Sequence, residues 1–133
     1  MTSLHLESVI LADRHHGLTE GVRGLLEAMF TAVVMVADED SFYTSVERIQ
    51  PDAAVVDLSL FRKGGLDWLA RAKVVCPQMI VIILSVHDEP AVRRAVLAAG
   101  AHGCVVKRSI ATDLLPAIET ALLHRHGAGR GAA

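Results

Sequence analysis

Polar side chains end or follow four apolar stretches of the sequence, and their types suit chemistry at a single site. Asp13 and Arg14 follow the first of these stretches, Asp57 and Ser85 end two others, and Lys107 follows the last. In open parallel α/β sheets, ligands bind beyond the carboxyl ends of the strands, where the strand order reverses. Each residue taken singly is equally well explained as a cap of the next turn or helix. Together they predict one pocket that contains carboxylates, a hydroxyl and cations.

The elements that position this pocket are five short apolar segments that alternate with five amphipathic stretches. This alternation predicts a parallel sheet covered by helices on both faces. The third and fourth segments are almost continuous apolar runs, which is typical of strands buried on both faces, so we expect them at the centre of the sheet. The predicted strands are residues 9–13, 33–37, 53–57, 79–85 and 103–106.

The first predicted helix has the clearest helical period. Its apolar stripe, which we expect to face the sheet, consists of Leu18, Val22, Leu25, Leu26 and Met29. The period is weaker in the other amphipathic stretches, so the ends of those helices are less well defined. We place the four remaining helices at about residues 41–49, 65–75, 89–99 and 113–124.

Length and composition predict one compact domain. The chain has 133 residues, of which 52% are hydrophobic and 21% charged. Its 13 Lys and Arg against 15 Asp and Glu give a formal net charge of -2, without a basic cluster. Phosphate backbones are bound by clustered cations, so we expect no direct binding of nucleic acid by this domain.

The ends of the chain and its cysteines indicate where the protein works. Residues 1–7 are too short and too polar for a signal peptide, and no apolar stretch approaches the roughly 20 residues of a membrane span. Cys76 and Cys104 lack partners at metal-ligand spacing, so we expect reduced core thiols in a cytoplasmic protein without a membrane partner. We assign residues 1–126 to the domain and the glycine-rich residues 127–133 to a flexible tail or the start of a linker.

Five motifs, in order, resemble the receiver domain of bacterial two-component response regulators, and most closely the NarL-type subgroup with a LuxR-type output domain. They are residues 9–27, 51–59, 83–88, 98–103 and 106–107, and the similarity extends over about residues 7–124. The resemblance implies a flavodoxin-like (βα)5 fold, with a doubly wound parallel five-stranded sheet of order 2-1-3-4-5. It also implies phosphorelay signal transduction, in which a sensor histidine kinase or a phosphotransfer protein phosphorylates Asp57.

The resemblance assigns a role to each polar residue of the pocket. Asp57 matches the phosphoacceptor, while Ser85 and Lys107 match the phosphate-binding hydroxyl and amine. Asp13 belongs to the acidic pocket, and Mg²⁺ would be held by Asp13, Asp57 and the backbone carbonyl of Ser59. Such a domain catalyses at most its own aspartyl phosphorylation and dephosphorylation.

Arg14 is the main departure from the family pattern, because it replaces a second acid that binds Mg²⁺ directly. The usual three carboxylates and one lysine carry a formal charge of about -2, whereas Asp13, Arg14, Asp57 and Lys107 sum to zero. We therefore expect weak or absent Mg²⁺ binding. Three alternatives stay open: Arg14 substitutes for the metal charge on the phosphoryl group, pairs with Asp57 or Asp13 and masks the nucleophile, or points into solvent.

Two further departures from the family pattern follow Asp57 in the sequence. Cys104 stands at the switch position, where the family usually has Tyr or Phe, and it is too small to move between a buried and an exposed position. Phe61 occupies the place of a common proline four residues past Asp57. These differences favour a loop of different shape and a domain without the aromatic switch.

Several other residues invite functional roles that we do not assign. His15, His16 and His87 are the histidines expected near the pocket rim, and we interpret them as solvated loop residues rather than metal ligands. Trp68 falls outside the apolar stripe of its predicted helix, so we expect it to be half-buried.

Two classes of function follow from these observations. In the first, the domain is a phosphoacceptor in signal transduction and transcription regulation, with weakened or absent dependence on Mg²⁺. In the second, it is a pseudo-receiver that acts as a dimerisation or protein-interaction module without phosphorylation. A homodimer and a LuxR-type DNA-binding domain outside this chain are compatible with both. A flavodoxin-like enzyme is disfavoured because no glycine-rich phosphate loop follows the first strand.

Overall fold

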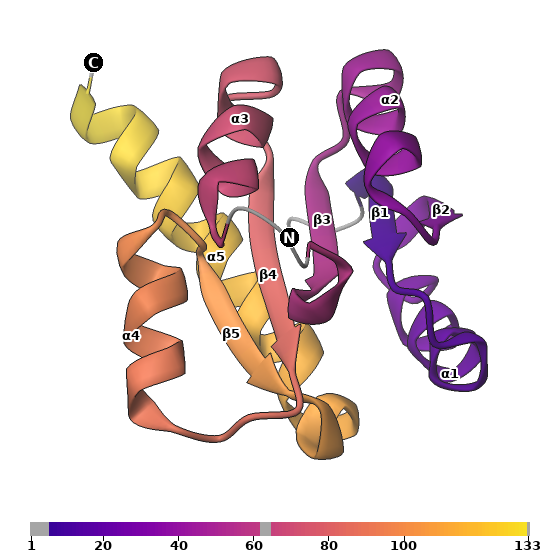
Figure 1. Cartoon of the computed structure of the whole chain (residues 1–133). Helices are drawn as coiled ribbons and strands as arrows, with labels where there is room; N and C mark the ends of the chain where they lie inside the picture. The colour runs from indigo at the N-terminus through magenta and orange to yellow at the C-terminus, as the bar shows by residue number, and fades with distance from the viewer. Residues whose placement is uncertain (1–5, 62–64, 133) are drawn as a thin grey trace.

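The computed structural model describes residues 6–61 and 65–132, without the side chains of residues 16, 18 and 126–132. Within these residues, five parallel strands form one sheet of order β2-β1-β3-β4-β5 (Figure 1). The predicted flavodoxin-like sheet and the central place of the third strand are confirmed. The strands are β1 (Leu6–Ala12), β2 (Phe30–Val36), β3 (Ala53–Asp57), β4 (Ile80–Ser85) and β5 (Gly103–Val106).

The strand register brings the carboxyl ends of four strands to nearly the same level. Ala12 of β1 lies beside Val56 of β3, and each precedes one of the two pocket aspartates. Ser85 at the end of β4 lies beside Val106 at the end of β5. Polar residues that end or follow these strands therefore share one edge of the sheet.

Helices cover both faces of the sheet, as the sequence pattern predicts. Leu26 and Leu114, from the first and last helices, belong to the core on one face, while Phe42, Leu69 and Val96 belong to the core on the other. The helices are α1 (His16–Leu26), α2 (Glu39–Ile49), α3 (Asp67–Val75), α4 (Pro90–Ala98) and α5 (Ile110–Ala132), with short 3-10 turns η1 (Leu58–Leu60) and η2 (Lys107–Ser109).

The apolar stripe of the first helix lies as expected, and it extends past the end of α1. Val22, Leu26 and Met29 are buried against the sheet, and Leu25 is half-buried beside them. The side chain of Leu18, which belongs to the same predicted stripe, lies outside the described residues. Helical period alone was therefore enough to orient this helix.

Helices α2 and α3 each begin two residues from the predicted position, for local reasons. Helix α2 begins at Glu39 rather than at residue 41, because the Asp38 carboxylate caps it by accepting a hydrogen bond of 2.8 Å from the Ser41 N–H. Helix α3 begins at Asp67 rather than at residue 65, because Gly65 has a φ of +57° and so lies outside the helical region.

The last helix is longer at both ends than the predicted span of residues 113–124. It begins at Ile110, directly after the η2 turn, and continues to Ala132. Extending an existing helix requires no new nucleation, so a glycine-rich sequence can follow it in helical form. The assignment of residues 127–133 to a tail or linker stays a prediction.

Trp68 is buried, and the expectation of a half-buried side chain is wrong. Only 4% of its surface is exposed, because Phe61 stacks on it with ring centroids 4.2 Å apart and planes 7° from parallel. Phe42 of α2 meets the Trp68 ring edge-on at 5.9 Å. The period of α3 could not reveal this, because the covering rings come from a loop and from another helix.

The two cysteines lie in the core, as the sequence predicts. Cys76 and Cys104 are both buried and free of disulfides. Among the described residues, no helix has the combination of length and apolar character that crossing a bilayer requires.

Candidate functional site

The polar residues of the predicted pocket are buried at the carboxyl edge of the sheet. Asp13, Asp57 and Ser85 expose only 4%, 2% and 1% of their surface, although the surrounding core is almost wholly apolar. Buried carboxylates require hydrogen-bond or charge partners. The partners of these two aspartates define the site.

The Asp57 carboxylate accepts hydrogen bonds at both oxygens. The Ser59 N–H donates to Oδ1 at 3.2 Å, and the Ser59 hydroxyl donates to Oδ2 at 2.9 Å. Lys107 Nζ lies 3.1 Å from Oδ2 as an ion pair. Burial by itself would raise the pKa of Asp57, but the hydrogen bonds from Ser59 and the charge of Lys107 outweigh it and lower that pKa. Asp57 is therefore an ionised carboxylate.

Lys107 joins the two aspartates. Its Nζ lies 3.2 Å from Asp13 Oδ2 as well as 3.1 Å from Asp57 Oδ2, and its side chain is only 10% exposed. Lys107 directly follows β5, which β4 separates from β3 in the sheet. Its long side chain therefore spans the end of β4 to reach the aspartates that end β3 and follow β1. This amine neutralises one of the two buried negative charges.

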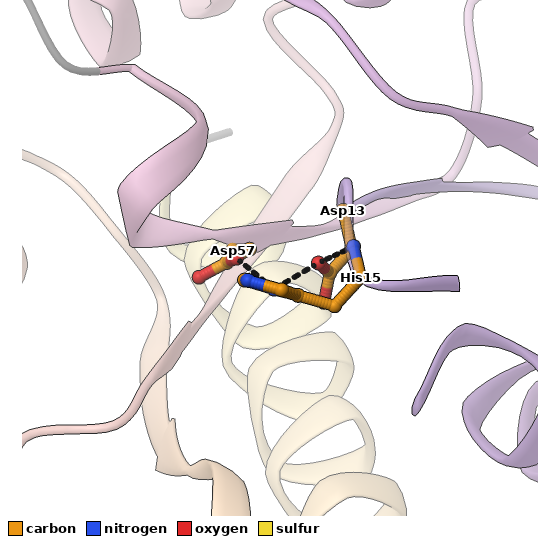
Figure 2. A group of neighbouring side chains, drawn as sticks. All are labelled: Asp13, His15 and Asp57. Carbon is orange, nitrogen blue, oxygen red and sulfur yellow. Dashed lines mark hydrogen bonds and ion pairs between the residues drawn. The ribbon is translucent and has the colours of Figure 1, made fainter. Parts of the chain in front are cut away.

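His15 is the member of the site that the sequence analysis missed. Its Nδ1 lies 2.9 Å from Asp13 Oδ1 and 3.2 Å from Asp57 Oδ2, so the ring sits between the aspartates, as Figure 2 shows. The backbone N–H of His15 also donates to Asp13 Oδ1 at 2.8 Å. An aspartate that bonds the backbone two residues on forms an Asx turn, and this turn brings the third side chain back beside the carboxylate. Aspartate at residue 13 with histidine two positions later was the available signal.

Arg14 contacts the loop after Asp57, and of the three alternatives for this residue the structure does not show the ion pair with Asp57 or Asp13. Its guanidinium donates to the carbonyl of Leu60 at 3.3 Å, and no ion pair joins it to Asp13 or Asp57 in the described structure. The chain bends at Arg14, so that the side chains of Asp13 and His15 meet each other while the Arg14 guanidinium reaches Leu60. The cations at Asp57 are therefore Lys107 and, when protonated, His15.

A cavity of about 400 Å³ lies over Asp57, and its walls contain both predicted and unpredicted residues. Ser85 lines it, and the Ser85 hydroxyl oxygen accepts a hydrogen bond of 3.0 Å from the His87 N–H. His87 also lines the cavity, while the side chain of His16 lies outside the described residues. The cavity leaves room for a phosphoryl group above the Asp57 carboxylate.

Cys104 lies apart from this cavity, beside a separate hollow of about 130 Å³ between the β4–α4 loop and the end of β5. The thiol is 7% exposed, and burial raises its pKa. The switch position is therefore occupied by a small, neutral side chain with free space next to it.

The residues present do not match the Mg²⁺ site of the family. Mg²⁺ prefers an octahedron of oxygen ligands, often with carboxylates and water. Here Arg14 replaces the second acid, and the amine of Lys107 contacts both remaining carboxylates. The third atom that lies close to the two carboxylates is a nitrogen of His15 rather than an oxygen. Asp13, Asp57 and the Ser59 carbonyl, the predicted metal ligands, thus form an incomplete set for Mg²⁺.

Comparison with known proteins agrees with the fold and the motif order. Residues 9–119 match the family described as the response regulator receiver domain. The chain is 31% identical over 116 residues to the probable transcriptional regulatory protein NarL of Mycobacterium tuberculosis, covering 83% of this chain and 52% of that protein. It is 27% identical over 113 residues to the transcriptional regulatory protein DegU of Brevibacillus brevis, covering 84% of this chain and 48% of that protein. The chain spans about half the length of these relatives.

Solved structures give the same assignment. A LuxR-family two-component response regulator from Aurantimonas sp. SI85-9A1 is similar with a TM-score of 0.80 and 30% identity, over 90% of this chain and 87% of that one. The signal receiver domain of the putative response regulator NarL from Mycobacterium tuberculosis is similar with a TM-score of 0.74 and 25% identity, over 92% of this chain and 98% of that one. The chain therefore belongs to the receiver domains of two-component response regulators and is related to those of the LuxR type.

Proposed function

We propose that Asp57 accepts a phosphoryl group from a sensor histidine kinase or a phosphotransfer protein, with less dependence on Mg²⁺ than is usual in the family. The observation that carries the proposal is the position of Lys107 Nζ, 3.1 Å from Oδ2 of Asp57, whose carboxylate borders a cavity of about 400 Å³. A nucleophilic carboxylate, a neutralising amine and space for the reacting group occur together there.

In the proposed reaction, an Asp57 oxygen bonds to the phosphorus of a phosphohistidine as the phosphorus–nitrogen bond breaks. The electron pair of that bond stays on the donor's imidazole, and an aspartyl phosphate forms. Lys107 pairs with one phosphoryl oxygen, and the Ser85 hydroxyl donates to another. Both residues border the nucleophile, Lys107 by contact and Ser85 across the shared cavity.

Local charge supports reduced dependence on a divalent ion. Mg²⁺ neutralises the charge that develops on the phosphoryl group. Lys107 supplies one positive charge in direct contact with the nucleophile, as the family's lysine does, so the difference from the family must come from the other charges of the pocket. His15 Nδ1 lies 3.2 Å from the same carboxylate and provides a second donor when it is protonated. Arg14 lowers the attraction for Mg²⁺, because it replaces the second acid and so leaves the pocket with less negative charge.

Related receivers support the phosphoacceptor over the pseudo-receiver. The isolated receiver domain of RcsB from Salmonella enterica, 27% identical to this chain with a TM-score of 0.75, has been solved in the presence of the phosphomimetic BeF3-. Another RcsB structure, 26% identical, is bound to the promoter rprA. We extend this to the protein from which the chain derives: a DNA-binding output domain follows the receiver and responds to the state of Asp57.

The test is incubation of the chain with acetyl phosphate, with Mg²⁺ or with a chelator, followed by intact-mass measurement. We expect an adduct in both conditions and none in the Asp57→Asn variant. The Asp67→Asn variant, which alters an exposed aspartate at the start of α3, should be modified like the wild type. An adduct only with Mg²⁺ would overturn the metal part of the proposal. No adduct in either condition would favour the interaction module that works without phosphorylation.

A further inference from the structure

We propose that the outer edge of β2 is a dimerisation surface, on which β2 of a second copy of this chain pairs in the antiparallel direction and continues the sheet. Strand β2 ends the sheet order, so β1 is its only neighbour among the described strands (Figure 1). The pairing includes no residue of the Asp57 site and requires no phosphoryl group. The proposal therefore goes beyond the proposed function, and the two can fail separately.

The hydrogen bonds to β1 decide which peptide groups of β2 point outward. The Asp13 N–H donates to the Val36 carbonyl at 3.0 Å, so Val36 faces β1. Peptide groups of a parallel strand face its two sides alternately, so Val34 also faces β1, whereas Val33 and Met35 face outward. Within the described part of the chain, no hydrogen bond reaches the outward groups of these two residues. The edge therefore presents unpaired donors and acceptors at strand spacing.

The composition of β2 leaves this edge open to another strand. Its seven residues, Phe-Thr-Ala-Val-Val-Met-Val, include no charged residue, proline or glycine. Exposed edges of natural sheets are usually protected from pairing by short length, charges, prolines or bulges. The helices do not cover the edge either, because Ala32 is exposed and Met35 exposes 39% of its surface.

The opposite edge of the sheet has the protection that β2 lacks. Strand β5 is only four residues long and begins with a glycine. Arg93, Asp113 and Pro116, from α4 and α5, line the hollow beside it. Short length, charges and a proline are three of the usual devices against strand addition. The contrast assigns strand pairing to β2 rather than to β5.

A second copy of β2 fits this edge because the strand is complementary to itself. In a two-fold antiparallel pairing centred on Val34, Val33 of each copy lies opposite Met35 of the other, and these outward groups exchange N–H and carbonyl bonds. At the centre, Val34 lies opposite Val34, and further out Ala32 lies opposite Val36. Every such cross-strand pair is apolar, and no like charges oppose each other.

The first experiment is sedimentation equilibrium of the full chain at concentrations up to about 1 mM. One strand pair is a small interface, so we expect a dimer with a dissociation constant on the order of 100 µM. Met35→Pro removes an outward N–H from each copy and no bond to β1, so it should raise that constant by about tenfold or more. The matched control, Met35→Thr, keeps the N–H and should dimerise like the wild type. Circular dichroism verifies that both variants are folded.

A monomer at every concentration would overturn the proposal. Equal dissociation constants for the wild type and Met35→Pro would also overturn it, because the dimer would then use another surface.

Oxidative cross-linking tests the register of the two strands. Val34→Cys places two thiols at a non-hydrogen-bonded pair with Cα atoms about 4.5 Å apart, so it should form a disulfide-linked dimer. Ala32→Cys is the control: its position is exposed, but its two copies lie far apart along the paired strands, so it should stay uncross-linked. Cross-linking at residue 32 and not at residue 34 would reject the register.

Hydrogen exchange followed by NMR adds a readout on the wild type. The N–H groups of Val33 and Met35 should become protected as the concentration rises. Protection that does not depend on concentration would mean that another segment of the same chain covers the edge, and it would overturn the proposal.

Discussion

Two regions on the same face of the sheet, the aromatic side and the open side, differ in how they are filled. On the aromatic side, next to β1 and β3, the rings of Phe42, Tyr43, Phe61 and Trp68 pack against one another. On the open side, beside β5, Cys104 borders a hollow of about 130 Å³. Both regions belong to the core shared by α2, α3 and α4.

This difference shows where the domain has room to change. Stacked rings in a close-packed core resist displacement, so the aromatic side is a rigid support for the loop after Asp57. The open side contains the β4–α4 loop, in which Val86 is 66% exposed. Since Cys104 is too short to act as a rotamer switch, we expect a change at Asp57 to move this loop rather than a ring.

The largest effect should come from the aromatic side. Trp68→Ala removes the partner of the Phe61 stack and leaves a void, so it should lower the free energy of unfolding by about 3–5 kcal/mol. Urea denaturation followed by circular dichroism measures this change. Val74→Ala, at an 81% exposed position on the same helix, should stay within about 0.5 kcal/mol of the wild type. A small loss for Trp68→Ala would mean that the rings do not support the fold.

A gain of volume on the open side should cost less. In the Cys104→Tyr variant, the new ring can point toward the neighbouring hollow. We therefore expect the free energy of unfolding to fall by about 1–3 kcal/mol in the same assay. The matched control is Cys76→Tyr, because Cys76 is 2% exposed in the core and its thiol lies 3.7 Å from the Pro51 carbonyl. If both variants lost the same stability, the contrast between the two sides would be wrong.

The pocket between the two regions should respond to charge rather than volume. Arg14→Asp supplies the missing acid and should raise Mg²⁺ affinity by about tenfold or more, measured by calorimetry or NMR shifts. Arg14→Gln removes the charge without adding a ligand, so it should raise affinity less. Equal Mg²⁺ affinities in the wild type and Arg14→Asp would show that residue 14 does not control ion binding.

The smallest effect concerns pH on the open side. His102 precedes β5, and its Nδ1 accepts a hydrogen bond of 3.0 Å from the Val81 N–H. Partial burial, followed by the charges of Lys73 and Arg125, lowers the pKa of His102 below its usual 6.5. The folded chain then binds fewer protons than the unfolded chain, so the contribution of His102 is complete above pH 6.5 and decreases as the pH falls toward the folded pKa.

Urea denaturation at several pH values between 5 and 8 tests the titration of His102. The fall in stability below pH 6.5 should be smaller in His102→Gln than in the wild type, because that variant cannot titrate at this position. Identical pH profiles would assign the dependence to other groups.

Much of the fold could be predicted because the signals are local. The apolar runs of β3 and β4 and the helical stripe through Val22 and Leu26 depend on residues a few positions apart. The order of the strands came from the motif resemblance, and it places Asp13, Asp57, Ser85 and Lys107 at one edge. Helix starts were less accurate, because a single cap at Asp38 or a glycine with positive φ at residue 65 decides them.

By itself, the sequence determined the sheet, the identity of the charged groups and the edge at which they gather, since these follow from periodicity and from polar residues at strand ends. Only the tertiary structure decided the direction of each side chain. Arg14 turns to a carbonyl 46 residues away, and His15 meets an amine 92 residues away. Such partners are joined by the folded backbone, and no local pattern of residues specifies which of them a side chain will reach.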